Sequence, residues 1–324
     1  MKRALLIGIN DYPVSPLKGC VNDINELEQA VSRNGDGSKN FDVRKLPNVQ
    51  TFKEVMDNIE FLFHDDADVA LLYFSGHGMV SSSGAQIAIP EGITTSGPYV
   101  GIQLDEIMDV VNRSRVKHKI VILDCCYSGN AGKYNVQDSS SALYPGVTIL
   151  TACRDDETAA EAGGHGLFTE LLCSALRGGA ADFSGNITVG GVYAYIDRSI
   201  GSWGQRPVFK TNVAEFIPLK TVNPQVSAHI IRQFPSLFVN MDSPLALDPS
   251  FEDTNDPSIK HEWVEPYAIP ENVQKFKALQ KLQSIGFVRP VGAEFMYFAA
   301  MQSKACELTE LGKFYWRLVA DGRI

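Results

Sequence analysis

Two glycine-flanked segments carry the residue types that nucleophilic catalysis needs. The first reads Y-F-S-G-H-G at 73–78 and contains His77, and the second reads D-C-C-Y-S-G at 124–129 and contains Cys125 and Cys126. A thiol is only slightly ionised at neutral pH, and a nearby imidazole can remove or hold its proton. The pair indicates a cysteine nucleophile activated by a histidine, if the fold brings the two segments together.

The elements around these segments predict a fold that does so. Short apolar runs predict strands at 3–9, 42–46, 69–74, 120–123 and 147–151, and helical periodicity predicts helices at 21–33, 52–63, 104–111, 167–176 and 192–200. Apolar strands that alternate with helices predict an α/β fold with a mostly parallel sheet covered on both faces. Because the carboxyl ends of parallel strands form the functional edge of such a sheet, His77 and the cysteine pair at 125–126 are expected side by side on loops there.

Peptide cleavage also requires hydrogen-bond donors for the oxyanion, and the backbone N–H groups of Gly78 and Cys126 are the candidates. The alternative is that these residues only pack. Cysteine is among the most buried residue types, and a lone cysteine at a strand end is usually part of the core. The presence of both residue types after apolar strands, each with glycine neighbours, favours catalysis.

The S-G-H-G segment followed by D-x-C-x-S-G resembles the caspase superfamily, and within it the metacaspase and orthocaspase branch. Other segments also match this family, namely L-I-G-I-N-D-Y at 6–12, L-K-G-C-V-N-D at 17–23, L-T-A-C-R-D-D-E-T-A at 150–159, G-L-F-T at 166–169 and G-Q-R-P at 204–207. The resemblance covers about residues 1–218. It implies a caspase–haemoglobinase fold and a cysteine endopeptidase that works through a His77–Cys126 dyad and an acyl-enzyme.

The resemblance also assigns the nucleophile and the specificity. It selects Cys126 over Cys125, because the family's cysteine stands two places after the aspartate. Metacaspases hold acidic residues in the pocket for the residue before the scissile bond (P1) and cut after Arg or Lys. Asp23 and Asp124 stand at the matching positions here, with Cys20 and Ser75 beside them.

Two carboxylates in a narrow pocket would favour a guanidinium or ammonium group through charge-assisted hydrogen bonds. The alternatives remain open. Asp23 could serve as a helix N-terminal carboxylate that the helix dipole stabilises. Asp124 could serve as a hydrogen-bond acceptor within the scaffold of the site.

The peptidase domain is expected at 1–220, with a large-subunit-like part at about 1–130, a loop at 130–145 and a small-subunit-like part at 146–220. In the family this loop is often cut during activation, and Lys133 fits the expected specificity. An uncut surface loop is the alternative. No acidic cluster has calcium-ligand spacing, since Asp155, Asp156 and Glu157 are contiguous. No metal site or other cofactor is therefore predicted, and calcium activation stays open.

The composition changes after about residue 220. Prolines recur through 221–262, and residues 221–259 hold one basic and five acidic residues, which predicts an irregular Pro-rich acidic connector. Beyond it the pattern predicts a helix at 272–285, strands at 287–291, 295–299 and 306–308, and a helix at 311–319. This order resembles a small α+β winged-helix-like domain at 263–324.

Winged-helix modules bind DNA or dock proteins. Lys275, Lys277 and Lys281 lie together on the first predicted helix of this domain, but residues 260–324 hold nine basic and seven acidic residues. So small an excess of positive charge favours a docked protein regulator over DNA.

Bulk properties fit a globular protein, with 44% hydrophobic and 21% charged residues and a formal net charge of −9. No apolar run is long enough to span a bilayer, and six scattered cysteines suggest a reducing cytoplasm. The expected partners are protein substrates with a basic P1 residue, without a membrane. Family analogy suggests a regulated protease in stress, cell death or antiviral defence. The alternatives are a catalytically silent caspase-like scaffold and a winged-helix DNA-binding regulator.

Overall fold

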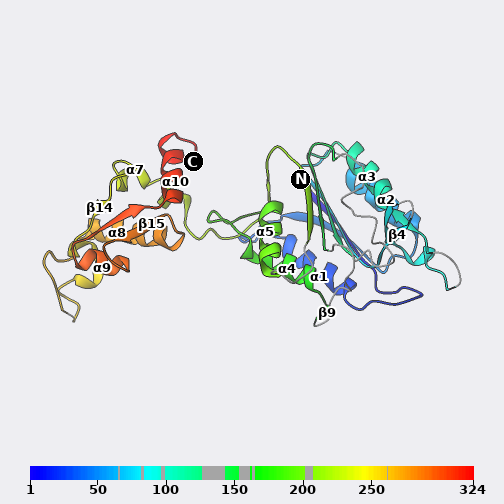
Figure 1. The fold of residues 1–324 in the computed structure, drawn as a ribbon, viewed down its shortest axis with the longest axis horizontal. Coiled ribbons are helices and arrows are strands. Elements are labelled where there is room, and N and C mark those ends of the chain that lie inside the picture. Colours follow the sequence, from blue (N-terminus) through cyan, green and yellow to red (C-terminus); the bar gives the residue numbers. More distant parts are fainter. Residues whose placement is uncertain are drawn as a thin grey trace. The chain divides into compact units, whose positions relative to one another are not determined.

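The computed structural model describes residues 1–64, 66–81, 84–95, 99–125, 143–152, 161–162, 165–200, 207–260 and 262–324. Its chain divides into two compact units, Met1–Asn223 and Pro224–Ile324 (Figure 1). None of the described helices is long and apolar enough to cross a bilayer.

The first unit is built on a six-stranded sheet in the order β12-β8-β7-β3-β1-β2. Its strands are β1 (Lys2–Gly8), β2 (Phe41–Pro47), β3 (Val69–Ser75), β7 (His118–Asp124), β8 (Val147–Thr151) and β12 (Val208–Asn212). All neighbours pair in parallel except β12, which is antiparallel to β8. Every residue of the interior strand β3 is buried, which explains why its sequence is apolar from Val69 to Phe74. The predicted, mostly parallel sheet is confirmed.

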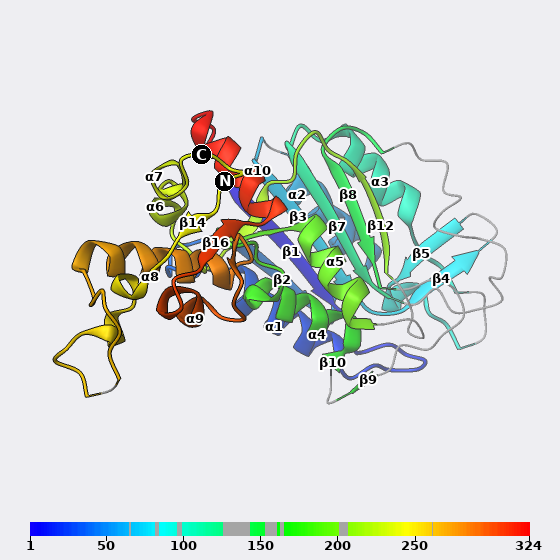
Figure 2. The same ribbon diagram turned by 60° about the vertical axis from the view of Figure 1, so that its left-hand side comes forward.

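Helices cover both faces of this sheet, as Figure 2 shows. The helices are α1 (Cys20–Val31), α4 (Leu167–Ser174) and α5 (Val189–Ile200) on one face, and α2 (Phe52–His64) and α3 (Leu104–Arg113) on the other. Strand β1 shows how one run of residues serves two cores, because successive side chains of a strand point to opposite faces. Leu5 and Ile7 join the core that α2 and α3 cover, and Leu6 joins the core of α1 and α4.

The first unit also contains shorter elements outside the six-stranded sheet and its covering helices. They are β4 (Gly78–Ser81), β5 (Gly84–Ala88), η1 (Pro90–Gly92), β6 (Gly101–Gln103), β9 (Glu161–Ala162), β10 (His165–Gly166), η2 (Ala175–Gly179), β11 (Asn186–Thr188) and β13 (Pro218–Thr221). Strands β4, β5 and β6 form an antiparallel sheet, so the chain after His77 turns directly into β4.

The second unit combines short helices with a three-stranded antiparallel sheet in the order β14-β16-β15. Its elements are α6 (Ala228–Ile231), α7 (Phe234–Leu237), β14 (Leu245–Ala246), η3 (Pro249–Phe251), η4 (Asp253–Asn255), α8 (Pro270–Ser284), β15 (Val288–Val291), α9 (Met296–Met301), β16 (Ala305–Leu308) and α10 (Glu310–Ala320). The predicted helices at 272–285 and 311–319 and the predicted strands at 287–291 and 306–308 are confirmed.

The strand predicted at 295–299 is wrong, because residues 296–301 form helix α9 between β15 and β16. The expected hairpin of a helix–hairpin–helix order is therefore interrupted by a helix. Met296, Ala299 and Ala300 are buried on one side of α9, and this spacing of three and four residues is helical. In so short an apolar run the periodicity of a helix is hard to distinguish from that of a strand.

The segment predicted as a connector at 221–262 also differs from expectation. The second unit begins at Pro224, and β14 within this segment pairs with β16. Phe234 and Phe238 are completely or almost completely buried, and the Phe234 ring stacks on Phe287 at 5.9 Å. The prolines therefore lie in a folded segment and not in a linker, because the aromatic residues between them are buried in a hydrophobic core.

Candidate active site

The carboxyl ends of β3 and β7 bring the two predicted catalytic segments to one edge of the sheet. These strands pair in parallel with Ser75 opposite Asp124, and Gly76 N donates a hydrogen bond to Asp124 O at 3.4 Å. His77 follows Ser75 by two residues, and Cys126 follows Asp124 by two residues. Cys126 and Lys133 lie outside the described residues, so the dyad and the cleavage site remain predictions.

His77 is half-buried, and its ring is held by a backbone carbonyl. His77 Nε2 lies 2.6 Å from Ser15 O, and a carbonyl oxygen can only accept. Nε2 therefore carries a proton, and in a neutral ring Nδ1 is the basic nitrogen. Ser15 has a positive φ of 56°, which is uncommon for a residue other than glycine.

Asp23 is a buried carboxylate with two donors. It is 2% exposed and lies in the first turn of α1. Ser75 Oγ donates to Asp23 Oδ2 at 3.0 Å, and Gly166 N donates to Asp23 Oδ1 at 3.3 Å. The structure thus joins Asp23 to Ser75 and to Gly166, and their role as a pocket for the P1 residue stays a prediction.

Asp124 lies at the end of a chain of hydroxyl groups. Thr169 Oγ1 donates to Asp124 Oδ2 at 2.5 Å, so the Tyr73 hydroxyl 2.5 Å from Thr169 must be the donor to Thr169. Burial raises the pKa of Asp124 to about 7, the Thr169 hydrogen bond lowers it, and the Asp23 charge raises it further. Burial and then the charges of Asp124 and Asp23 hold the pKa of Tyr73 well above its usual value.

Gly166 shows that the two carboxylates face one point. A Cβ at Gly166 would lie 3.0 Å from Asp124 Oδ2 and 3.7 Å from Asp23 Oδ2. Both carboxylates therefore pack closely against the backbone of Gly166. Asp23 and Asp124 lie together with Gly166 at the same edge of the sheet as His77, and this acidic cluster is called the acidic pocket below, after the role expected for it.

The remaining predicted residues have simpler surroundings. Cys20 is buried as the first residue of α1, and its carbonyl oxygen lies 2.3 Å from a Cβ built at Gly8, so it marks a close contact of α1 with β1. Cys125 is 3% exposed and belongs to the core under α2 and α3. Gly78 is half-buried at the start of β4. Among the described residues no three His, Cys, Asp or Glu side chains form a metal-binding group, and Asp155–Glu157 lie outside that set.

Sequence reasoning did not assign roles to Tyr12, Tyr73, Gly166 or Thr169. Tyr12, Gly166 and Thr169 stand in segments that match the caspase superfamily, which was the available signal. Thr169 lies on α4, 45 positions after Asp124, so only the fold brings it to that carboxylate.

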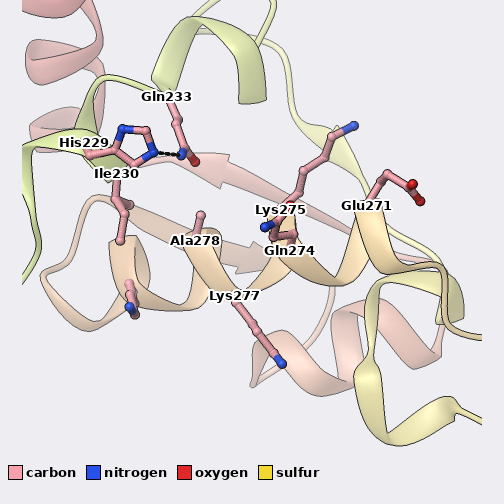
Figure 3. Close-up of a pocket in the computed structure, with 9 residues that line it drawn as sticks. His229, Ile230, Gln233, Glu271, Gln274, Lys275, Lys277 and Ala278 are labelled. Carbon is pink, nitrogen blue, oxygen red and sulfur yellow. Dashed lines mark hydrogen bonds between the residues drawn. The ribbon is translucent and has the colours of Figure 1, made fainter.

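The second unit has a basic groove of about 620 Å³ between α6–α7 and α8 (Figure 3). Its lining residues are His229, Ile230, Gln233, Glu271, Gln274, Lys275, Lys277, Ala278 and Lys281. Lys277 pairs with Asp253 at 2.7 Å, whereas Lys275 and Lys281 have no carboxylate partner among the described residues. A second groove is lined by Val264, Tyr297, Phe298 and Met301 among others, and Tyr297 and Phe298 are each more than 40% exposed.

Comparisons with known proteins place the first unit in a family. A sequence model of the caspase domain, the peptidase C14 family, matches residues 1–211. Metacaspase-1 of Candida albicans is 36% identical over 85 residues, which cover 24% of this chain and 19% of that protein, so the matched stretch spans about a fifth of its length.

Two solved structures are also similar to this chain. Protein GSU0716 from Geobacter sulfurreducens has a TM-score of 0.52 at 17% identity and covers 69% of this chain and 100% of its own. Caspase-1 from Spodoptera frugiperda has a TM-score of 0.48 at 14% identity and covers 68% of this chain and 90% of its own. With its helix-covered, mostly parallel sheet and the caspase-domain match over residues 1–211, the chain belongs to the caspase family of cysteine peptidases.

Proposed function

We propose that this protein is a cysteine endopeptidase that cuts protein chains after Arg or Lys. The observation that carries the proposal is that the carboxylates of Asp23 and Asp124 lie together against Gly166, at the sheet edge that also bears His77. A cationic P1 side chain in this pocket would lie beside two carboxylates and gain charge-assisted hydrogen bonds. Thr169 donates to Oδ2 of Asp124 and Ser75 donates to Oδ2 of Asp23. Oδ1 of Asp124 is the oxygen proposed to accept from the P1 side chain.

In the proposed mechanism His77 Nδ1 accepts the thiol proton of Cys126, while Ser15 O holds Nε2–H. The thiolate attacks the carbonyl carbon after the basic residue. The backbone N–H groups of Gly78 and Cys126 donate to the oxyanion that forms. The imidazolium then protonates the leaving amine, and a thioester remains on Cys126.

Hydrolysis completes the cycle. Water enters as the amine leaves, and His77 removes its proton while the oxygen attacks the thioester. Collapse of the second tetrahedral intermediate expels the Cys126 thiolate and releases a carboxylic acid. The proton that His77 took from water then passes to the sulfur or stays on the imidazolium, and the free enzyme is regenerated.

The test is peptidase activity of the full chain and its Cys126→Ala variant. Fluorogenic peptides with Arg, Lys or Asp at P1 are compared with and without calcium, and the protein is then run on a gel. Cleavage after Arg or Lys that disappears in Cys126→Ala supports the proposal. Cleavage after Asp overturns the acidic pocket and keeps the dyad.

No cleavage by the wild type, together with a Cys126 thiol that reacts with alkylating agents no faster than an ordinary cysteine, would favour the silent scaffold. A product cut at Lys133, absent in Lys133→Gln, would establish processing of the loop at 130–145. A regulated role in stress, cell death or antiviral defence remains an inference from family analogy.

For the second unit we propose that the basic groove docks an acidic protein segment. Lys275 and Lys281 give it positive charge, while Ile230 and Ala278 provide an apolar floor. DNA is less favoured, because Glu271 lies in the same groove and Lys277 is already paired. The exposed Tyr297 and Phe298 of the neighbouring groove also suit protein contacts.

Fluorescence anisotropy would decide this point. A labelled peptide of alternating Glu and Leu and a random-sequence DNA duplex are titrated with the full chain at two salt concentrations. Peptide binding that is lost in Lys275→Glu/Lys281→Glu but kept in Lys304→Glu, a lysine outside the groove, supports docking. Strongly salt-dependent duplex binding favours the DNA-binding regulator, and binding of neither probe removes the proposal.

A further inference from the structure

We propose that Tyr12 is a positioning residue for catalysis: it fixes the backbone and the ring of His77 in the orientation that proton transfer with Cys126 requires. This inference rests on the proposed function, because it concerns the same dyad.

The Tyr12 hydroxyl closes a ring of three hydrogen bonds around His77. His77 N donates to the Tyr12 hydroxyl at 3.0 Å, and the hydroxyl donates to Ala88 O at 3.1 Å. Ala88 N in turn donates to His77 O at 2.8 Å. An amide N–H can only donate and a carbonyl can only accept, so both roles of the hydroxyl are fixed. Both backbone groups of His77 are therefore tied, directly or through Tyr12, to strand β5.

The hydroxyl is shielded from water. Tyr12 is 4% exposed, and burial raises its pKa well above the usual value, so it remains a neutral donor at any physiological pH. A buried N–H or C=O without a hydrogen-bond partner costs about 1–3 kcal/mol. Loss of the Tyr12 hydroxyl would remove the partner of both His77 N and Ala88 O.

Gly76 explains how the hydroxyl comes so close. A Cβ at Gly76 would lie 2.5 Å from the Tyr12 hydroxyl oxygen and 2.8 Å from the Phe74 ring. No positive φ is needed at this glycine. The first glycine of the S-G-H-G segment is therefore required by the approach of Tyr12, and not by the shape of the turn.

Tyr12 also contacts the imidazole itself. The two ring centroids are 4.6 Å apart with an interplanar angle of 54°. Ser15, whose carbonyl holds His77 Nε2, follows Tyr12 in the same loop, and this loop is closed by Leu17 N donating to Asn10 O at 2.9 Å. One loop thus restrains His77 at its backbone, at its ring face and at Nε2, so that Nδ1 is left for the thiol.

The test is the rate of alkylation of Cys126 by iodoacetamide as a function of pH, followed by mass spectrometry on the full chain, with peptidase assays in parallel. The variants are Tyr12→Phe, His77→Ala and a matched control, Tyr195→Phe. The control removes a hydroxyl that bonds Ser174 at 2.9 Å between α4 and α5, outside the site.

In the wild type the thiol should react at a pH well below the ordinary cysteine value of about 8.5, and His77→Ala should abolish this shift. Tyr12→Phe should move the pH profile of Cys126 alkylation toward that of His77→Ala, with alkylation about tenfold slower near pH 6. Its kcat should be about tenfold lower at unchanged KM. Tyr195→Phe should match the wild type. A purely structural role for Tyr12 would lower the melting temperature and leave the pH profile in place.

The outcomes separate the two claims. If the wild type titrates like His77→Ala, the dyad itself fails. If the wild-type profile is shifted and Tyr12→Phe retains both that shift and the wild-type kcat, the dyad holds and the role of Tyr12 is overturned. Should Tyr12→Phe not fold by circular dichroism, Gly76→Ala decides the same point, because its methyl group would displace the hydroxyl and should produce the same shift.

Discussion

The charge of the acidic pocket should depend on pH within the neutral range. Burial and the neighbouring Asp23 raise the pKa of Asp124 to about 7, against the opposing hydrogen bond from Thr169. Above this pKa the empty pocket holds a second carboxylate, and below it Asp124 is protonated and neutral. A cationic P1 side chain should therefore bind better on the alkaline side.

The size of the effect follows from the pKa. With a midpoint near pH 7, the ionised fraction of Asp124 falls about tenfold between about pH 8 and about pH 6. We expect kcat/KM for an Arg peptide to fall by up to this factor through the pocket alone. The quantity to measure is the ratio of kcat/KM for an Arg peptide to that for a matched peptide with Gln at P1, because effects on the chemical step common to both peptides cancel in this ratio.

Thr169→Val sharpens the test. Removing a hydrogen bond to the ionised carboxylate raises the pKa of Asp124 further, so the midpoint of this ratio should move to higher pH. Tyr73→Phe should move this midpoint in the same direction by less, because the Tyr73 hydroxyl lies 3.5 Å from Asp124 Oδ2 and the Thr169 hydroxyl lies 2.5 Å from it. A ratio that stays flat from pH 6 to pH 8, or a midpoint that moves down in Thr169→Val, would refute the reasoning.

Three further results are expected. Gly166→Ala would place a methyl group 3.0 Å from Asp124 Oδ2, so KM for Arg peptides should rise about tenfold while the Gln peptide changes little, as steady-state kinetics would show. The raised pKa of Asp124 in the folded state means that its contribution to stability is present below the unfolded value near 3.8 and is lost as pH rises through about 7. The melting temperature of Asp124→Asn should therefore exceed that of the wild type by more at pH 8 than at pH 4.5. An equal difference at both pH values would contradict this. Phe234→Ala should lower the free energy of unfolding by about 3–5 kcal/mol in urea titrations, since the ring is fully buried, and a loss under about 1 kcal/mol would contradict its place in the core.

Most of the sheet could be predicted from sequence because its interior strands β1, β3, β7 and β8 are almost wholly buried. Strand β3 is apolar at every position up to Tyr73 and Phe74, and no amphipathic helix has that pattern. The same reasoning placed His77 at the strand end, where a parallel sheet concentrates its functional loops.

Other parts could not be read from local patterns. Helix α9 is six residues long, too short for its period to be distinguished from a strand. The contact of Thr169 with Asp124 and that of Tyr12 with Ala88 join residues 45 and 76 positions apart, and neither hydroxyl lies in a segment whose local spacing indicates a contact. Such contacts are set by the packing of α4 and of the loop after β1 against the sheet edge.

The pocket combines two demands that oppose each other. A site for a cation needs negative charge, yet two carboxylates facing Gly166 repel each other and are poorly solvated. A pKa near 7 for Asp124 resolves the conflict, because the empty pocket can hold a proton in place of the second charge. In the proposed function, an arriving guanidinium would favour ionisation of Asp124, and the proton would leave as the substrate binds. On this proposal, the full charge of the pocket exists mainly when a cation is present to neutralise it.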